Sequence, residues 1–389
     1  MHKIMFSAGE VSGDMHGASL AAAIKKIEPE AKLFGFGGNQ MQQAGVDIRF
    51  DMKEYNVMGF WEVLKNLRRM FRLRDALVQV MEEERPDLLV LIDYPDFNWR
   101  LAAKAKKLGI PVFSYIPPSA GAWRKGRAKP VAKMADQIAA IFPFETKVYE
   151  DAGARIEFVG NPLTETVHPS MEKAEAAKLL EMDLNKQNVL LLPGSRRQEV
   201  HLLLPEMLAA AKALQQRHPD MDFFLPAAPG IEKTWLEEMI HSLGISVQIK
   251  DSHLYDLMHC CDFALATSGT VTLEAALIGL PSVVLYKMSP ISYFIGNLLV
   301  HLPNFSLPNI IAGERILPEL LQKEITTGRI VEEAETMLRG TKSAAELQQK
   351  LRSLRDKLHR DDAAGYTAAL ILETADRCAA GRRILEDHA

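Results

Sequence analysis

The chain has 389 residues, of which 48% are hydrophobic and 25% are charged, values close to those of an average soluble globular protein. This length exceeds what a single core usually organises, so we expect two domains. The formal net charge is −4, which lacks the basic field of a general nucleic-acid-binding protein, so we expect no nucleic-acid partner. The 3 cysteines form neither a disulfide framework nor a Cys-x-x-Cys metal pattern, which favours a reducing compartment, the cytoplasm.

Neither a signal peptide nor a membrane span is predicted. The apolar run near the N-terminus is broken at Ser7, which is too early for a signal peptide. The most apolar long stretch, residues 263–286, contains hydroxyl groups, Glu274 and Pro281 in its interior. We therefore expect a protein that is not integral to a membrane.

A polar, glycine-rich loop follows the first predicted strand. Residues 4–6 form the strand, residues 7–17 form the loop, and a helix with a regular apolar face comes next. The loop carries Glu10, Asp14 and His16, which favour a ligand site. A tight turn that lets the helix pack on the strand is the alternative interpretation.

Residues 57–74 combine apolar and aromatic side chains with cations, without an acidic residue between positions 63 and 74. Such a segment can lie on an anionic membrane surface. A helix that covers the sheet and exposes a solvated basic face is the other interpretation. The side chains that characterise the segment are Phe60, Trp61, Arg68, Arg69 and Arg72.

Two further features lie beyond the next strands. Asp93 and Asp96 follow the buried strand predicted over residues 88–92, where open α/β sheets bind their ligands, although an aspartate there can also cap the next helix. Residues 117–129 place Trp123 beside Arg124 and other cations. This loop can grip a phosphorylated ligand or be a solvated basic turn.

The second half of the chain twice combines a strand, a glycine loop and a helix. Residues 189–192 are apolar, and after Pro-Gly-Ser a helical pattern begins. Helix N-termini attract phosphate, and Arg196 adds a planar cationic fork, although the loop alone fits a structural turn as well. The same arrangement returns at Ser268, Gly269 and Thr270, with Glu274 one turn further along, and this repetition favours nucleotide binding.

Short strands alternate with helix-length segments along both halves. We therefore predict an α/β protein with two doubly wound, Rossmann-like domains that face a cleft. The predicted divisions are residues 1–162, residues 163–340, and C-terminal helices over residues 341–389 that pack back across the domains.

Six motifs together resemble the lipid-A-disaccharide synthase family. They run in the family's order from residue 7 to residue 309 and make the match specific. The motifs are Ser-Ala-Gly-Glu-Val-Ser-Gly-Asp at 7–14, Met-Gly-Phe-Trp-Glu-Val at 58–63, Ile-Asp-Tyr-Pro-Asp-Phe-Asn at 92–98, Leu-Pro-Gly-Ser-Arg at 192–196, Thr-Ser-Gly-Thr at 267–270 with Glu274, and Ser-Leu-Pro-Asn at 306–309.

The resemblance implies a GT-B glycosyltransferase of lipid A biosynthesis in a Gram-negative bacterium. It would join UDP-2,3-diacylglucosamine to 2,3-diacylglucosamine 1-phosphate and release UDP and a β-1,6-linked disaccharide. The acceptor would approach through the first domain and the basic segment, with Trp123 and Arg124 nearby, although Gly121 stands where the family has a second tryptophan. The expected UDP contacts are Gly194, Ser195, Arg196, Ser268, Gly269, Thr270, Glu274, Lys287 and Asn309.

Such a transfer inverts the donor sugar and needs one general base. We interpret Asp96 as that base because it lies beyond Pro95 in a loop that should face the cleft, and Asp93 as buried or capping the next turn. Glu10 is the second candidate and His16 the third. The chain has no Asp-x-Asp motif and its 11 histidines show no metal-like spacing, so we expect neither a metal nor another cofactor.

The expected location is the cytoplasmic face of the inner membrane, with peripheral attachment to anionic lipid and a homodimer as an open possibility. Two alternatives share the UDP loops. A UDP-sugar epimerase of GT-B-like fold would need no lipid surface, and a non-catalytic membrane-bound nucleotide sensor would show no turnover.

Overall fold

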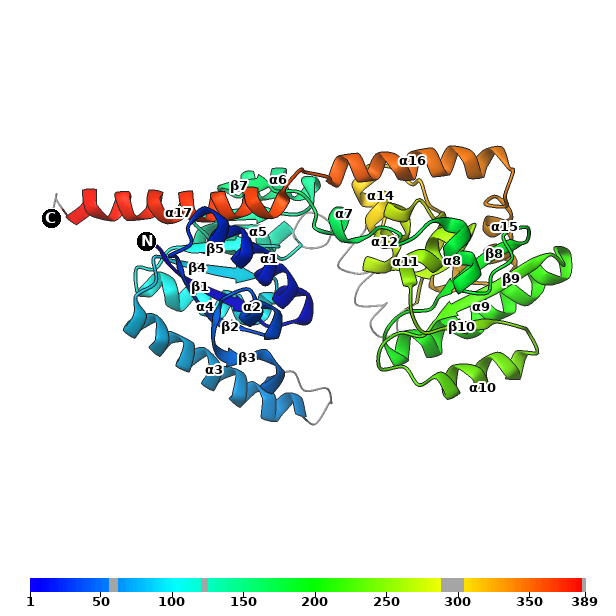
Figure 1. Cartoon of the computed structure of the whole chain (residues 1–389), viewed down its shortest axis with the longest axis horizontal. Coiled ribbons are helices and arrows are strands. Elements are labelled where there is room, and N and C mark those ends of the chain that lie inside the picture. The colour runs from blue at the N-terminus through cyan, green and yellow to red at the C-terminus, as the bar shows by residue number, and fades with distance from the viewer. Residues whose placement is uncertain (56–61, 120–124, 288–303, 387–389) are drawn as a thin grey trace. The chain divides into compact units, whose positions relative to one another are not determined.

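The computed structural model describes residues 1–55, 62–119, 125–287 and 304–386. The chain divides into two compact units, Met1–Pro162 with His359–Ala389, and Leu163–Leu358. Each unit is a parallel sheet with helices on both faces (Figure 1). The predicted architecture of two doubly wound α/β domains is confirmed, and the chain passes from the first unit to the second after Pro162.

The first unit holds a sheet of 7 strands in the order β3-β2-β1-β4-β5-β6-β7. Its elements are β1 (Lys3–Ala8), α1 (Val11–Ile27), β2 (Lys32–Gly37), α2 (Asn39–Gln43), β3 (Asp47–Asp51), η1 (Met52–Glu54), α3 (Glu62–Glu84), β4 (Leu88–Ile92), α4 (Pro95–Lys107), β5 (Val112–Tyr115), η2 (Lys125–Arg127), α5 (Ala128–Met134), β6 (Gln137–Ala140), α6 (Pro143–Glu150), β7 (Ile156–Phe158) and α17 (Ala363–Glu386).

The second unit holds a sheet of 6 strands in the order β10-β9-β8-β11-β12-β13. Its elements are α7 (Leu163–Thr166), α8 (Lys173–Leu179), β8 (Gln187–Leu192), α9 (Arg197–Arg217), β9 (Met221–Pro226), α10 (Lys233–Leu243), β10 (Gln248–Lys250), α11 (Leu254–Cys260), β11 (Phe263–Thr267), α12 (Thr270–Ile278), β12 (Ser282–Tyr286), α14 (Leu307–Ala312), β13 (Glu319–Leu321), η3 (Gln322–Glu324), α15 (Thr327–Glu335) and α16 (Lys342–Leu358).

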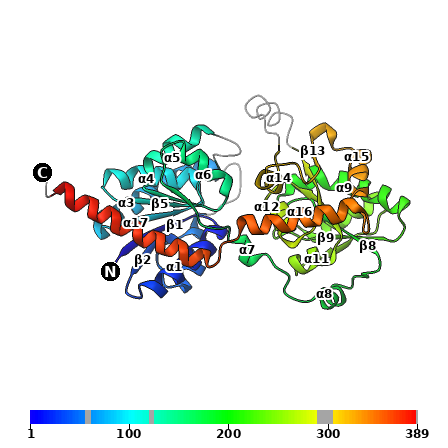
Figure 2. The same cartoon turned by 90° about the horizontal axis from the view of Figure 1, so that it is seen from above.

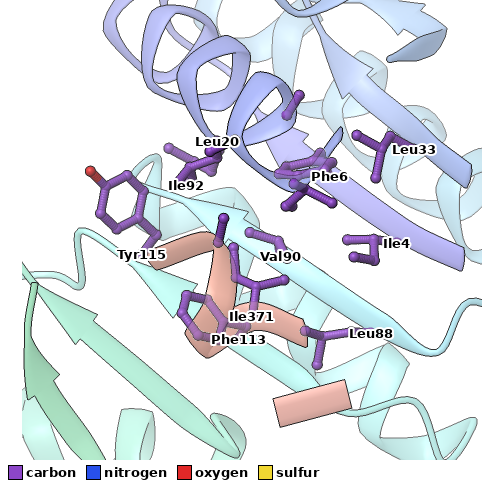
Figure 3. Close-up of a cluster of buried hydrophobic side chains, with 14 of the residues drawn as sticks. Ile4, Phe6, Leu20, Leu33, Leu88, Val90, Ile92, Phe113, Tyr115 and Ile371 are labelled. Carbon is purple, nitrogen blue, oxygen red and sulfur yellow. The ribbon is translucent and has the colours of Figure 1, made fainter. Parts of the chain in front are cut away.

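The central strands of the first sheet are apolar on both faces because helices cover both. All five residues of β4 are buried, which explains their uninterrupted apolar sequence. On one face, Phe6 of β1 and Val90 of β4 pack with Leu20 of α1 and Ile371 of α17 (Figure 3). The last helix is therefore part of the first unit's core.

The C-terminal helices divide between the two units. Helix α16 packs on α12 and α14 and stays in the second unit. Helix α17 packs along α1 of the first unit (Figure 2). The division falls between Leu358 and His359, in the short connection between the two helices.

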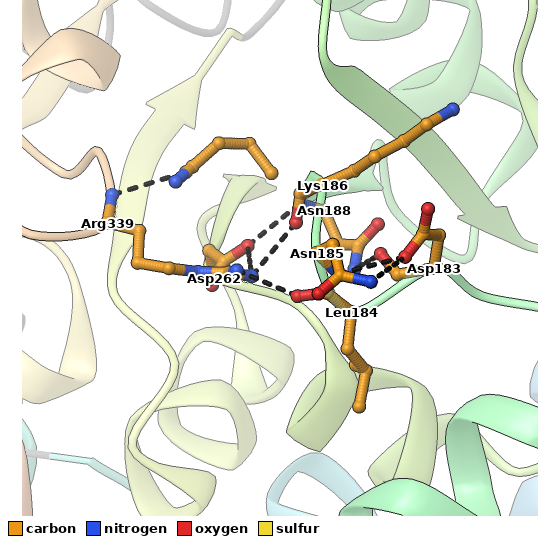
Figure 4. Close-up of polar contacts among 8 residues, drawn as sticks. Asp183, Leu184, Asn185, Lys186, Asn188, Asp262 and Arg339 are labelled. Atoms are coloured by element: carbon orange, nitrogen blue, oxygen red, sulfur yellow. Dashed lines mark hydrogen bonds and ion pairs between the residues drawn. The ribbon is translucent and has the colours of Figure 1, made fainter.

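Arg339 anchors the connection between α15 and α16 to the second sheet (Figure 4). Its guanidinium pairs with the Asp262 carboxylate at 2.8 Å, just before β11 begins. It also donates to the carbonyl oxygens of Leu184 and Lys186, at 2.8 and 2.9 Å, just before β8. One planar side chain thus holds three chain segments at the amino ends of these strands.

Asp14 is a structural residue and not part of a ligand loop. It lies buried in α1, where its carboxylate accepts hydrogen bonds from the backbone N–H groups of Gly38, Gln40 and Met41 at 2.8, 3.0 and 3.1 Å. These groups open α2 and have no partner within that helix. The Asp14 side chain, which belongs to α1, therefore caps the N-terminus of α2.

We predict that Asp14→Ala lowers the free energy of unfolding by about 1–3 kcal/mol, because it leaves buried N–H groups without an acceptor. Urea denaturation followed by circular dichroism measures the change. Glu30→Ala is the control, because Glu30 is an exposed acid in the same unit. Equal stability of the two variants would show that α2 does not depend on this cap.

Candidate functional site

Both sheets reverse their strand order at one point, and the candidate residues lie there. In the first unit the chain leaves β1 toward β2 and β3 on one side, while β4 lies on the other side. β1 and β4 are parallel neighbours, with Ala8 opposite Ile92 at their carboxyl ends. Ligands of open α/β sheets bind at such a point, because the two following loops diverge there.

Three carboxylates follow these two strands. Glu10 precedes α1 and is exposed, as is Asp96, whereas Asp93 is half-buried. Burial raises the pKa of Asp93, and the negative charge of Glu10 raises it further. An acid whose charge is disfavoured in this way, at a strand's carboxyl end, is typical of a functional site.

One detail of the predicted acids was wrong. Asp96 lies in the first turn of α4 and not in a loop, because Pro95 occupies the first position of that helix. Asp93, predicted to be buried or to cap the next turn, is half-buried, and Tyr94 is the N-cap residue of α4. Asp93 and Tyr94 both have positive φ, 46° and 50°, a region that non-glycine residues rarely adopt and that is common at functional sites.

Asn98 joins the two loops, which sequence reasoning missed. The side chain of Asn98 is buried and accepts a hydrogen bond from the Ser7 hydroxyl at 2.7 Å. It donates to the backbone oxygen of Asp93, also at 2.7 Å. At Gly9 a Cβ atom would come within 2.3 Å of the Tyr94 ring, so the glycine permits the close contact between the loops.

His16 is a poor candidate for a base. Its ring lies edge-on to Tyr115 with the centroids 6.1 Å apart. Burial lowers the pKa of His16 to about 4, so the ring is neutral at physiological pH but shielded from solvent. The exposed carboxylates are better placed to reach a substrate.

In the second unit the strand order reverses between β8 and β11. The loop after β8 contains Gly194 with φ of 117°, and a Cβ atom there would lie 2.6 Å from the Glu199 carboxylate. Ser195 and Arg196 are exposed, and Arg196 pairs with Glu199 at 2.8 Å. The loop thus presents a hydroxyl and a cation at the N-terminus of α9, a combination that suits an anion.

The loop after β11 lies beside the loop after β8, because the two strands are parallel neighbours with Ala266 opposite Leu192. Gly269 and Thr270 are exposed at the start of α12, and Ser268 is half-buried. These residues offer N–H and hydroxyl groups at a helix N-terminus, as the sequence predicts.

Glu274 lies on one of two neighbouring elements of the second unit, and Lys287 directly follows the other. Glu274 is half-buried on α12, and burial raises its pKa. Lys287 follows β12, the next strand after β11, and its ammonium group pairs with Glu206 of α9 at 2.9 Å. Glu206 therefore holds the Lys287 side chain toward the helix that begins at the Arg196 loop.

The Asn309 side chain is bonded within the second unit, and the predicted contact of this residue with UDP stays a prediction. Its side chain is buried, and its amide nitrogen donates to Leu317 and Glu319 at 2.9 and 2.8 Å. Its oxygen accepts from the backbone N–H groups of Ile316 and Leu317 at 2.9 and 2.8 Å. All four hydrogen bonds of the amide are thereby used, and none is left for a ligand.

Residues 62–74 of the basic segment form part of α3, which covers the sheet as one of the two interpretations predicts, and the contact of its basic face with a membrane stays a prediction. Leu73, Leu77 and Met81 are buried against the sheet. Arg68, Arg69 and Arg72 are exposed. The helix therefore covers the sheet with one face and presents cations on another. Four predicted acceptor or membrane residues lie outside the described residues, namely Phe60, Trp61, Trp123 and Arg124.

Within the described ranges, no group of three or more His, Cys, Asp or Glu residues has a geometry that could hold a metal ion. Among the same residues, no helix is long and apolar enough to cross a membrane.

The two-domain fold is shared with solved structures of low sequence identity. One is UDP-GlcNAc 2-epimerase from Neisseria meningitidis, with a TM-score of 0.64 and 13% identity over 95% of this chain and 100% of that one. Another is the calicheamicin glycosyltransferase CalG4, with a TM-score of 0.59 and 12% identity over 97% and 99% of the two chains. Glycosyltransferases and epimerases both have this GT-B fold, so the fold alone does not separate those activities.

Sequence comparison is more specific. The family model described as Lipid-A-disaccharide synthetase matches residues 4–372. The lipid-A-disaccharide synthase of Geobacter sulfurreducens is 40% identical over 96% of this chain and 97% of its own length. That of Coxiella burnetii is 37% identical over 95% and 97% of the two chains. The chain therefore belongs to the lipid-A-disaccharide synthase family of glycosyltransferases.

Proposed function

We propose that this protein joins UDP-2,3-diacylglucosamine to 2,3-diacylglucosamine 1-phosphate, and releases UDP and the β-1,6-linked disaccharide 1-phosphate. Its membership of the family carries the proposal. The geometry supports it, because exposed carboxylates follow β1 and β4 in one unit and hydroxyl and cationic groups follow β8, β11 and β12 in the other. A transferase needs both a base for the acceptor and stabilising groups for the leaving diphosphate.

In this proposal the reaction is a single displacement. The acceptor's 6-hydroxyl attacks the anomeric carbon of the donor as a carboxylate takes its proton, and the bond from that carbon to the UDP oxygen breaks. The displacement inverts the anomeric centre from α to β. Negative charge develops on the departing diphosphate, and Arg196, Lys287 and the N-terminal groups of α9 and α12 stabilise it.

The experiment that tests the activity incubates purified protein with the two acylated sugars and measures UDP release and disaccharide formation. An epimerase would convert the UDP-sugar without the acceptor, and a nucleotide sensor would bind UDP without turnover. UDP release that does not depend on the acceptor would contradict the proposed transfer.

We predict that Arg196→Ala weakens UDP binding about tenfold or more, because a charge-assisted hydrogen bond to a phosphate contributes roughly 1.5–3 kcal/mol. Isothermal titration calorimetry with UDP measures the change. Arg197→Ala is the matched control, because the Arg197 guanidinium stacks on Trp235, 4.8 Å from the ring centroid. Equal UDP affinity of the Arg196 variant and wild type would remove Arg196 from the donor site.

We propose Asp96 as the general base, because it is exposed in the first turn of α4 at the point where the strand order reverses. Asp96→Asn should lower kcat about 10²–10⁴-fold with UDP affinity nearly unchanged, since the base acts on the acceptor. Steady-state kinetics and calorimetry measure the two effects.

The neighbouring acids serve as comparisons. Glu10→Gln and Asp93→Asn should retain more activity than the Asp96 variant. If Glu10→Gln loses the larger factor while Asp96→Asn keeps most of its activity, Glu10 is the base. If Asp93→Asn loses the most activity, Asp93, whose pKa is raised, is the general base.

We further propose that α3 attaches the protein to the cytoplasmic face of the inner membrane, where acylated substrates are accessible. Each cation near an anionic surface contributes on the order of 1 kcal/mol, so replacing Arg68, Arg69 and Arg72 by Ser should weaken vesicle binding strongly. The loss should be largest at low salt, where screening is weakest. Co-sedimentation with phosphatidylglycerol vesicles measures it.

The matched control removes three exposed cations from α16 of the other unit, by replacing Lys342, Lys350 and Arg352 with Ser. Both triple variants have the same net charge. If the α3 and α16 variants lose vesicle binding equally, the attraction to anionic lipid comes from the overall charge of the protein and not from α3.

A further inference from the structure

A cavity of about 320 Å³ opens in the first unit, and Asp93 is one of the residues that line it. Residues that follow β4, β5 and β6 form its wall, so it lies at the carboxyl edge of the sheet. Pro117 and Phe142 give it an apolar lining. This volume is at the lower end of the range for small-molecule sites, and it suits one sugar ring better than a ring with its acyl chains.

The cavity contains both acidic and basic groups. Asp93 lines it from the end of β4, Arg127 from η2 and Glu145 from α6. Glu145 is 2% exposed, and the Ser119 hydroxyl is its hydrogen-bond partner. Burial raises the pKa of Glu145 to about 8, so at neutral pH this carboxyl is largely protonated and can donate a hydrogen bond.

We propose that this cavity binds the sugar ring of a phosphorylated hexosamine, with Arg127 contacting the phosphate and Glu145 donating a hydrogen bond to a sugar oxygen. The inference rests on the proposed function, in which the acceptor carries a 1-phosphate. A guanidinium suits phosphate because its N–H groups form a planar fork. A neutral acid beside it adds a donor without repelling the anion.

The charges around Glu145 give the proposal a specific pH dependence. Arg127 and Asp93 line the same cavity, and Tyr149 lies on the same helix with its hydroxyl donating to the Pro118 carbonyl at 2.5 Å. Burial and Glu145 both raise the pKa of Tyr149, so it stays neutral. On the elements packed against α6, Glu157 of β7 accepts a hydrogen bond from Tyr366, and Lys129 and Lys133 of α5 are exposed.

Loss of the Glu145 proton would therefore place a second carboxylate beside Arg127. This carboxylate would compete with the phosphate for the guanidinium, and its negative charge would repel the phosphate. Affinity should fall as the pH rises through the pKa of Glu145, about 8. Glu145→Gln keeps a neutral hydrogen-bond donor of similar size and should remove this dependence.

Ligand-observed NMR on the full chain tests the binding, with N-acetylglucosamine 1-phosphate as probe, because its amide does not titrate, and N-acetylglucosamine or inorganic phosphate in parallel arms. Wild type should bind the sugar phosphate more tightly than either part alone. Arg127→Gln should weaken binding about tenfold or more, whereas Lys129→Gln, an exposed cation nearby, should not. Equal binding by the Arg127 and Lys129 variants, or no wild-type binding at millimolar probe, would overturn the proposal.

The second arm repeats the titration from about pH 7 to about pH 9, where phosphate is already a dianion. Wild type and Glu150→Gln, an exposed acid on the same helix, should lose affinity about fivefold or more, and Glu145→Gln should not. A fall that persists in Glu145→Gln would overturn the role of Glu145. The UDP-release assay separates this inference from the proposed function. If UDP release is normal but the NMR titrations do not give the expected binding, the transferase activity stands and this cavity is rejected as the acceptor site.

Discussion

A parallel sheet that changes its winding direction leaves two loops that diverge at the carboxyl ends of neighbouring strands, and this constraint positions the candidate site in both units. In the first unit, β1 and β4 bring Glu10 and Asp93 near each other, although they lie 83 positions apart in the chain. In the second unit, β8 and β11 are parallel neighbours, so the loops that carry Arg196 and Ser268 begin side by side. The chemistry is therefore distributed over two edges built by the same rule.

Several polar residues near these edges stabilise the structure and leave no group for a ligand. Asp14 and Glu319 are both buried carboxylates that accept backbone N–H groups, Asp14 at the start of α2 and Glu319 from Phe305 and Ser306 before α14. Asn309 completes the second arrangement with its amide. Buried charge is tolerated at these positions because each oxygen receives donors. Exposure to solvent distinguishes Asp96 and Ser195 from these residues.

Much of the fold follows from local pattern, and most of the remainder depends on long-range contacts. β4 and β8 are predictable because buried parallel strands need continuous apolar runs. β3 escapes prediction because charged residues alternate along its half-exposed sequence, and β13 because it is only three residues long and begins with Glu319. Glu10, Asp93 and Arg196 could be predicted from strand ends. The roles of Asn98 and Asn309 could not, because a pattern does not show that Asn98 meets Ser7, 91 positions away.

The division of α16 and α17 between the units has a consequence for synthesis. During translation the chain emerges from its N-terminal end, and domains usually fold as units in that order. Here residues 163–358 follow the first sheet and contain their complete unit, whereas the first sheet still lacks Ile371, Ala368 and Ala375 of α17. The part of that sheet's face that α17 covers thus stays open until α17 leaves the ribosome. The second unit can finish folding before the first, and the nascent first unit exposes an apolar surface that chaperones recognise.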